Sequence, residues 1–361
     1  MIFFSVMKSI FFVLFSTRRV YGASYFTARN HRLLYNNQTE FLLKGVNYSG
    51  FETYCAAPHG LWAHNLDFYL DFISANEFNA IRLPFSFELT WKLDSPSQYE
   101  CVTYESDECK STIGNLLGCL FQKALDRNIF IVIDFHSIGS MLINEHPLGP
   151  LKAQEFYDAW DRILDRVIHY PNLLGLDIKN EPHGTTTWDE WGSLVNDFMN
   201  HIYNRYPDYQ GLFFVEGLQD EDACWGGSFA TLKNQLNLAR HNIVFSPHTY
   251  GVSVLGEKAI NYGEKEFHKW FGFLNDKYDN PIILGEAGGF FTGEDMHWHF
   301  RYSNYLKKIN QTSSFYWSLN PDSADTKGIL NDDWTSYNDA KLKFLKDLQP
   351  YPTKININHQ Q

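Results

Sequence analysis

The stretch from Leu173 to Gly184, LLGLDIKNEPHG, decides the fold of this 361-residue chain. It opens as an apolar run and ends in Asn180, Glu181 and Pro182. An apolar run of this length, closed by turn residues, predicts a buried strand, and proline should end it because proline cannot donate a ladder hydrogen bond. Glu181 is then left at the carboxyl end of the strand, where ligands bind if the sheet is parallel. Taken alone, Asn-Glu-Pro fits a turn or a helix-capping glutamate equally well.

The same pattern recurs along the chain, because apolar runs alternate with segments of helical periodicity. Such alternation predicts a parallel sheet, and eight units predict a single-domain α/β fold, the (β/α)₈ TIM barrel. A doubly wound sheet is the alternative, but no glycine-rich phosphate loop follows the first strand. The predicted strands are 41–46, 80–83, 129–133, 173–178, 212–215, 243–245, 282–284 and 314–317, and the predicted helices are 66–74, 113–127, 154–169, 188–204, 230–238, 264–277, 295–309 and 334–348.

Composition fits a globular protein with a large core: 44% of residues are hydrophobic and 20% are charged. The net charge of −12 comes from dispersed acids, and no basic stripe indicates nucleic-acid binding. Aromatic residues make up 17%, which is more than a core usually needs, so we expect some rings to line a sugar-binding groove. We expect a monomer.

The N-terminal residues have the pattern of a targeting signal. Met7-Lys8 and a short apolar run precede small residues near Gly22, so residues 1–22 are expected to be a cleaved signal peptide and the product a secreted protein without a membrane anchor. A short signal anchor is the alternative. Residues 23–350 are expected to form the catalytic domain, and the polar tail, 351–361, is expected to fray.

Cysteines and sequons fit a secreted chain. Five cysteines permit disulfides, and we expect Cys101 and Cys109 to pair across a polar loop while Cys119 stays a buried free thiol. No spacing indicates a metal site. Asn37 and Asn310 are plausible glycosylation acceptors, whereas Asn47 follows a strand and should be inaccessible.

In a barrel, polar residues at the carboxyl ends of the strands point into one bowl, where the active sites of this fold lie. Glu181 and Glu286, at the fourth and seventh strands, would face each other there. Arg82 could instead form a structural salt bridge, Trp317 could be a core ring, and the histidines of these strand ends could be core residues bonded to the backbone, but the shared location of the candidates favours a site. The remaining candidates are Asn47, Arg82, His136, Asn180, His248, Tyr250 and Trp317.

Two opposed carboxyls are the equipment of glycoside hydrolysis, in which one donates a proton and the other attacks the sugar. Arg82 should hold Glu286 ionised, and that negative charge should raise the proton affinity of Glu181. Tyr250 could donate to Glu286, and His248 could bond within the same network. Glu216 is expected to be structural, and Glu52 and Asp134 are less favoured carboxylates.

Asn180, His136 and Trp317 are the expected sugar contacts. Asn180 would bind the 2-hydroxyl, His136 another hydroxyl, and Trp317 would form a stacking floor.

With these residues in place, the chain resembles glycoside hydrolase family 5, the cellulase family. The motifs are Asn180-Glu-Pro182, His248-Thr-Tyr250, Glu286 at a strand end, Arg82 within Ile-Arg-Leu-Pro, and His136. Three further motifs, Gly50-Phe-Glu-Thr, His59-Gly-Leu-Trp and 320–330 (NPDSADTKGIL), are similar to the bacterial endo-β-1,4-glucanase branch. The resemblance covers roughly residues 42–334.

The resemblance implies retention of configuration, with Glu181 as acid/base and Glu286 as nucleophile, a β-glucan polysaccharide or oligosaccharide as substrate, and no cofactor or metal. The chain departs from the family pattern at Leu319, at Lys327 and at Ala287-Gly288, so subsite preference stays open. Other family 5 activities, β-mannanase, β-1,3-glucanase and endoglycoceramidase, are the alternatives. A non-catalytic carbohydrate-binding protein would lack one of the two glutamates.

Overall fold

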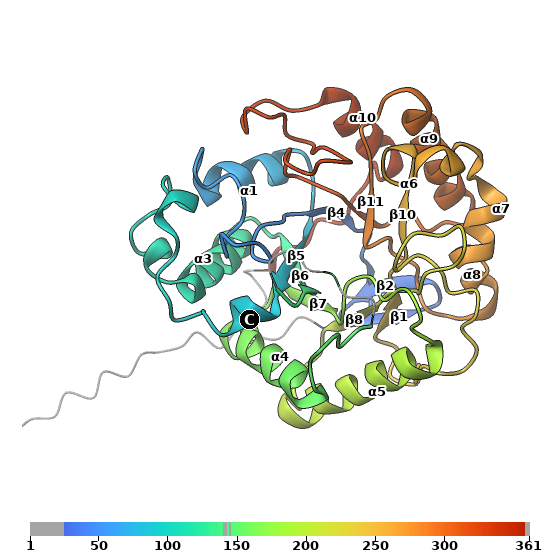
Figure 1. Ribbon diagram of the computed structural model, residues 1–361, viewed down its shortest axis with the longest axis horizontal. Coiled ribbons are helices and arrows are strands. Elements are labelled where there is room, and N and C mark those ends of the chain that lie inside the picture. The colour runs from blue at the N-terminus through green and yellow to red at the C-terminus, as the bar shows by residue number, and fades with distance from the viewer. Residues whose placement is uncertain (1–24, 140–142, 144–145, 358–361) are drawn as a thin grey trace, which may run out of the picture.

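The computed structural model describes residues 25–139, 143 and 146–357 (Figure 1). The predicted signal peptide, residues 1–22, lies outside the described residues. Within the described part of the chain, no helix is both long enough and apolar enough to cross a bilayer. Figure 1 shows the strands at the centre of a ring of helices.

The central sheet is parallel, and its seven hydrogen-bonded strands follow the order β12-β4-β5-β6-β7-β8-β9. Residues 282–284 close the ring, because Ile282 pairs with Phe245 of β9 and Leu284 pairs with Ser314 of β12. The predicted eight-stranded barrel is therefore confirmed. The strands are β4 (Lys44–Asn47), β5 (Ala80–Ser86), β6 (Phe130–Ser137), β7 (Leu173–Asp177), β8 (Leu212–Val215), β9 (Ile243–Phe245) and β12 (Ser314–Tyr316).

Two short strands carry the sheet further at the carboxyl end. β10 (His248–Tyr250) continues the sixth strand and β11 (Glu286–Gly288) continues the seventh. They pair in parallel, with His248 opposite Glu286. This pairing places a histidine and a carboxylate of the predicted site side by side.

Helices cover the outside, and most of the predicted ones are present. The long helices are α1 (Leu66–Ala75), α3 (Ile113–Asp126), α4 (Ala153–Val167), α5 (Trp188–Arg205), α9 (Gly293–Lys308) and α10 (Asp339–Leu348). The short ones are α2 (Phe87–Thr90), α6 (Val252–Leu255), α7 (Glu264–Phe267) and α8 (Leu274–Lys277), with 3₁₀ turns at η1 (Tyr99–Cys101), η2 (Cys109–Ser111) and η3 (Gly256–Asn261) and a π turn at η4 (His268–Gly272).

Three helix predictions need correction. Residues 230–238 form turns instead of a helix, because their carbonyls bond to neighbouring elements: Gln235 O accepts from the Asn196 side chain at 2.7 Å. The helix predicted over 264–277 is interrupted by the π turn η4. The last helix begins at Asp339, five residues later than predicted, where the Asn338 side chain accepts from Lys341 N at 3.1 Å and caps it.

A small antiparallel sheet, not predicted, closes the amino-terminal end of the barrel. It consists of β1 (Phe26–Arg29), β2 (Arg32–Tyr35) and β3 (Thr39–Glu40). Phe26 is buried with its ring centroid 5.2 Å from Phe130 at the start of β6, and Phe41 lies equally close to Phe130. Aromatic edge contacts of this kind seal the barrel floor.

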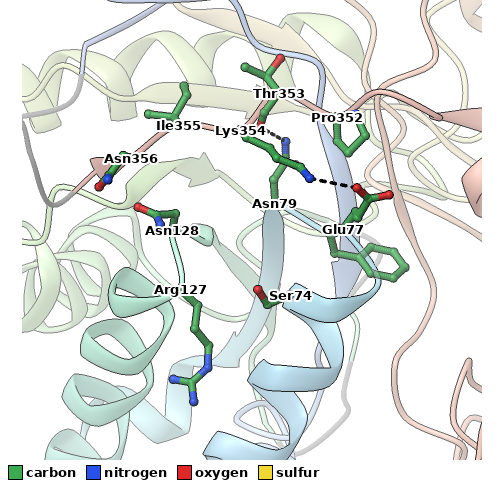
Figure 2. Close-up of a pocket in the computed structure, with 11 residues that line it drawn as sticks. Ser74, Glu77, Asn79, Arg127, Asn128, Pro352, Thr353, Lys354, Ile355 and Asn356 are labelled. Atoms are coloured by element: carbon green, nitrogen blue, oxygen red, sulfur yellow. Dashed lines mark hydrogen bonds and ion pairs between the residues drawn. The ribbon is translucent and has the colours of Figure 1, made fainter.

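The C-terminal tail is docked on the same end, so the expectation that it frays is wrong for residues 351–357. Thr353 N donates to Leu42 O at 3.0 Å, and Leu42 N donates to Thr353 Oγ1 at 2.8 Å. Ile357 is buried, and its N donates to Asn128 Oδ1 at 2.8 Å. Figure 2 shows the tail passing over Asn79 and Asn128, with Lys354 paired to Glu77.

Both predictions about the first four cysteines are wrong. Cys55 bonds to Cys101, and Cys109 bonds to Cys119 across the start of α3. Sequence spacing alone did not show that the turn after β4 brings Cys55 to the long loop before α3. Among the described cysteines, Cys224 is free and buried.

Deleting residues 351–361 should lower the free energy of unfolding by about 2–4 kcal/mol, because it exposes the Ile357 site and breaks several buried hydrogen bonds. Urea unfolding followed by tryptophan fluorescence measures this change. Lys354→Ala is the matched control and should change stability by less than about 1 kcal/mol, since its ion pair is exposed. An unchanged urea midpoint in the truncated chain would contradict a docked tail.

Candidate active site

Arg82 of β5 is the centre of the site. Its side chain is fully buried, and its guanidinium donates in several directions. Nη1 reaches Glu286 Oε1 at 2.6 Å, Nη2 reaches Glu216 Oε1 at 3.0 Å and Asp134 Oδ2 at 3.1 Å, and Nε reaches Asp177 Oδ2 at 2.8 Å. One cation thus serves carboxylates from four other strands, which explains how so many acids share a barrel interior.

Two amides complete the contacts of this guanidinium. Asn47 Oδ1 accepts from Arg82 Nη1 at 3.0 Å, and Asn47 Nδ2 donates to Gly285 O. Because Asn47 is fully buried, its sequon is inaccessible as expected. Asn180 Oδ1 accepts from Arg82 Nη2 at 2.9 Å, while Asn180 Nδ2 has no hydrogen-bond partner among the described residues and is left with donors.

Glu286, on β11, is held by two donors. Arg82 binds Oε1, and the Tyr250 hydroxyl donates to Oε2 at 2.5 Å. Burial raises the pKa of Tyr250 well above its usual value, so Tyr250 stays a neutral donor. Both contacts favour the ionised form of Glu286.

Glu181 follows β7 in a left-handed backbone conformation, with φ of 52°. Its N donates to Glu216 Oε2 at 2.6 Å, which holds this unusual turn. The role of Glu216 is therefore structural, as expected. His248 Nδ1 lies 3.0 Å from Glu181 Oε1, and the other ring nitrogen lies 3.1 Å from Glu216 Oε1.

The two catalytic candidates differ in pKa, and the expected direction is wrong. Burial raises the pKa of Glu286, and His248 and Arg82 do not fully offset it. Burial acts likewise on Glu181, but the hydrogen bond and charge of His248 outweigh it and lower the pKa. The expectation was based on Arg82 and Glu286 and omitted the direct contact between Glu181 and His248.

The imidazole of His248 holds a proton strongly. Burial opposes its charge, but Glu216, Glu286 and Glu181 outweigh burial and raise its pKa well above the usual value. His248 Nδ1 lies 3.0 Å from Glu181 Oε1, which is close enough for the two groups to share that proton. Glu181 and His248 are therefore one proton-holding pair.

His136 and Trp317 face each other at the mouth of the site. Their rings are parallel within 8°, with centroids 5.5 Å apart, and both line the cleft. Burial lowers the pKa of His136, but Asp134 at 2.6 Å raises it further than burial lowers it. The arrangement leaves a polar ring edge and an indole face available to a ligand.

The cleft has a volume of about 740 Å³ and includes both glutamates. It also exposes residues to which sequence reasoning gave no role. Trp225 is 42% exposed and stacks on His183 at 3.9 Å, on the Glu181 side of the cleft. The signal available in the sequence was a large aromatic residue in the segment that follows a predicted strand. Others are His59 and Asp322, which lie in motifs that gave no individual role, and the cleft is also lined by Glu52, a less favoured carboxylate of the sequence analysis.

Among the described residues, two sets of side chains bring possible metal-ligand atoms close together. Glu181, His248 and Glu286 offer atoms within 4.8 Å of one another, as do Asp134, Asp177 and Glu216. In the second set Arg82 supplies the positive charge, because it bonds to all three. In the first set, Glu181 and His248 form the proton-holding pair, and Glu286 is the carboxylate beside it.

Comparison with known proteins decides the family. The model of the cellulase family, glycosyl hydrolase family 5, matches residues 35–323. The chain belongs to this family. It is therefore a glycoside hydrolase, and the predicted resemblance is confirmed.

Two bacterial enzymes are similar to this cellulase-family chain. It is 30% identical to the major extracellular endoglucanase of Xanthomonas campestris over 85% of this chain and 67% of that protein. It is 27% identical to an endoglucanase of Paenibacillus polymyxa over 89% and 86% of the two chains.

Solved structures of the family agree with the fold. A complex of an endocellulase from Pyrococcus horikoshii with cellotetraose has a TM-score of 0.81 at 28% identity, covering 90% of this chain and 98% of that one. The catalytic domain of the Xanthomonas campestris enzyme has a TM-score of 0.83 at 27% identity, covering 90% and 100%.

Tyr250→Phe should move the acidic limb of the kcat/KM–pH profile to higher pH. The expected role of Glu286 as nucleophile requires its ionised form, burial already raises its pKa, and loss of the Tyr250 donor should raise the pKa further. At the pH optimum kcat/KM should fall about tenfold or more. Tyr209→Phe, which removes a hydroxyl bonded to Leu212 O at the barrel floor, is the control and should leave the limb in place. A limb that stays or moves to lower pH in Tyr250→Phe would refute the contact.

Proposed function

We propose that this chain is a secreted endo-β-1,4-glucanase that hydrolyses glucan with retention of configuration, using Glu181 as acid/base and Glu286 as nucleophile. The observation that carries the proposal is the position of the two carboxyls. An oxygen of Glu181 and an oxygen of Glu286 lie within 4.8 Å of each other in one cleft. Retaining enzymes hold their carboxyls about 5–5.5 Å apart, whereas inverting enzymes leave room for a water at about 6.5–9.5 Å.

The acid needs a proton, although His248 lowers the pKa of Glu181. A neutral His248 with a protonated Glu181 carries the same number of protons as a charged His248 with an ionised Glu181. Transfer from Nδ1 to Oε1 across 3.0 Å makes the carboxylic acid, while Nε2 keeps its hydrogen 3.1 Å from Glu216 Oε1. His248 is then the proton reservoir of the acid.

In the first step, Glu286 attacks the anomeric carbon and the bond to the leaving oxygen breaks. Glu181 gives its proton to that oxygen, and a glycosyl ester forms on Glu286. Forming the ester removes the negative charge of Glu286, which favours the ionised form of Glu181 for its next role. In the second step, Glu181 takes a proton from water, whose oxygen attacks the same carbon and releases Glu286.

The remaining site residues hold the sugar. Asn180, with unused donors, suits the 2-hydroxyl beside the anomeric carbon, and Trp317 with His136 offers a stacking face and a ring edge. The relatives named endoglucanase and the cellotetraose complex support a β-1,4-glucan as substrate. Two disulfides and the predicted leader support secretion.

Glu286→Ala should lower kcat on a β-1,4-glucan oligomer by about 10⁴-fold or more. Adding azide should restore turnover and give a glycosyl azide of inverted configuration, because azide takes the place of the nucleophile. Glu181→Ala with azide should give the retained product. Nuclear magnetic resonance of the products reads the configuration.

Glu52→Gln is the control, since it changes another buried carboxyl of the same cleft and keeps an oxygen for the bond from Gly50 N. Its activity should stay within about tenfold of the parent. Equal loss in Glu52→Gln, or an inverted product from the unchanged enzyme, would overturn the assignment. If the enzyme released more reducing ends from mannan or laminarin than from carboxymethylcellulose, its substrate would be a β-mannan or a β-1,3-glucan instead of a β-1,4-glucan.

A further inference from the structure

Two loops line the cleft on the Glu286 side. The β4 loop, residues 48–62, and the β12 loop, residues 317–328, follow neighbouring strands of the sheet. At their base Asn320 joins them, because its Oδ1 accepts from Ser49 N at 3.0 Å and its Nδ2 donates to Ser49 O at 3.2 Å. This buried contact fixes where the two loops start.

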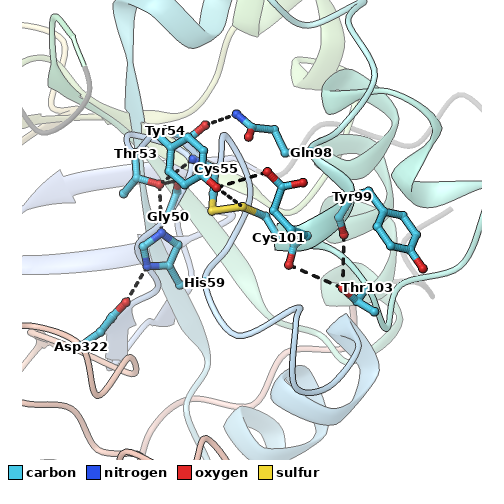
Figure 3. Close-up of a disulfide and its surroundings, with 11 residues drawn as sticks. Gly50, Thr53, Tyr54, Cys55, His59, Gln98, Tyr99, Cys101, Thr103 and Asp322 are labelled. Atoms are coloured by element: carbon cyan, nitrogen blue, oxygen red, sulfur yellow. Dashed lines mark hydrogen bonds and ion pairs between the residues drawn. A yellow bond between two sulfur atoms is a disulfide. The ribbon is translucent and has the colours of Figure 1, made fainter.

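At the tips a second connection crosses the gap (Figure 3). His59 Nδ1 lies 2.7 Å from Asp322 Oδ2, and His59 Nε2 lies 2.9 Å from Thr53 Oγ1. We call Thr53, His59 and Asp322 the rim bridge. All three line the cleft, and the side chains of His59 and Asp322 are only partly exposed.

The bridge spans the gap through the two nitrogens of one imidazole ring. Thr53 Oγ1 also donates to Gly50 O at 2.7 Å, so Thr53 is held within the β4 loop while it contacts His59. The ring therefore joins an anchored residue of the β4 loop to Asp322 of the β12 loop.

A disulfide fixes the outer side of the β4 loop. Cys55 lies between Thr53 and His59 in sequence and bonds to Cys101, and Gln98 Nε2 donates to Tyr54 O at 2.5 Å. The β4 loop is thus fastened to residues 98–101, away from the cleft. The rim bridge in turn ties the β12 loop to this fixed support.

We propose that the rim bridge sets chain-length specificity: it holds the β12 loop against the glucan units that lie beyond the cleaved sugar on the Glu286 side. This inference rests on the proposed function. Thr53, His59 and Asp322 act as positioning residues and take no part in bond cleavage. Their effect should appear in KM for long substrates and spare kcat on short ones.

The test compares His59→Ala and Asp322→Ala with the parent enzyme on β-1,4-glucan oligomers from trimer to hexamer. We expect KM for the longest oligomers to rise about tenfold, with kcat on the shortest cleaved oligomer within about twofold. The double variant should lose no more than either single one, because both break the same bond. Asp322→Ala changes the more exposed of the two side chains and serves where His59→Ala fails to fold.

The chain offers two matched controls. Asp332→Asn breaks an exposed pair with Lys327 in the same part of the chain and should change no KM. Replacing Cys55 and Cys101 by Ser should reproduce the loss on long oligomers, whereas replacing Cys109 and Cys119, whose bond ties the same long loop to α3, should lower only the unfolding temperature.

Equal losses on all chain lengths, additive losses in the double variant, or unchanged KM would each overturn the inference. Failure of the proposed function looks different, since the parent enzyme would then cleave no β-1,4-glucan oligomer of any length.

Discussion

The guanidinium of Arg82 is the interaction on which the rest of the site depends. It is fully buried and bonds to carboxylates from β6, β7, the end of β8 and β11. Without a cation at this point, several acids would be buried below the cleft with no compensating charge, and burial would keep them protonated. Asp177 shows the balance, because burial raises its pKa well above the usual value although Arg82 opposes the rise. The same cation lets Glu286 be buried and still reach an ionised state.

The two carboxyls of this cleft have different charged and hydrogen-bonding partners. Glu286 has a permanent cation on one oxygen and a hydroxyl donor on the other, whereas Glu181 has only the imidazole of His248. A carboxyl bound to a permanent cation suits an attacking group, and a carboxyl bound to a titrating ring suits a group that gives and takes one proton. The difference between two chemically identical side chains therefore comes from their partners.

The sequence predicted the position of a residue correctly where that position follows from the strand that carries it. The barrel, the strand ends and the bowl that joins Glu181 to Glu286 all follow from alternation, because parallel strands end at the same face. It failed where placement depends on distant contacts. The partner of Cys55, the docking of Ile357 and the turn that replaces the helix at 230–238 are set by surfaces that no local pattern encodes. The predicted direction of the Glu181 pKa shift was wrong for the same reason, because it depends on the distance between Glu181 and His248.

The small sheet β1–β3 and the docked tail share one location, the amino-terminal end of the barrel opposite the cleft. Both ends of the described chain therefore leave from the face that carries no chemistry. A tether joined before residue 25 or after residue 357, whether to a bead, a cell surface or a second module, would attach at the amino-terminal end of the barrel, opposite the cleft. An immobilised form would then present its open mouth outward to an insoluble fibre, and orientation on a support would follow from the fold without further engineering.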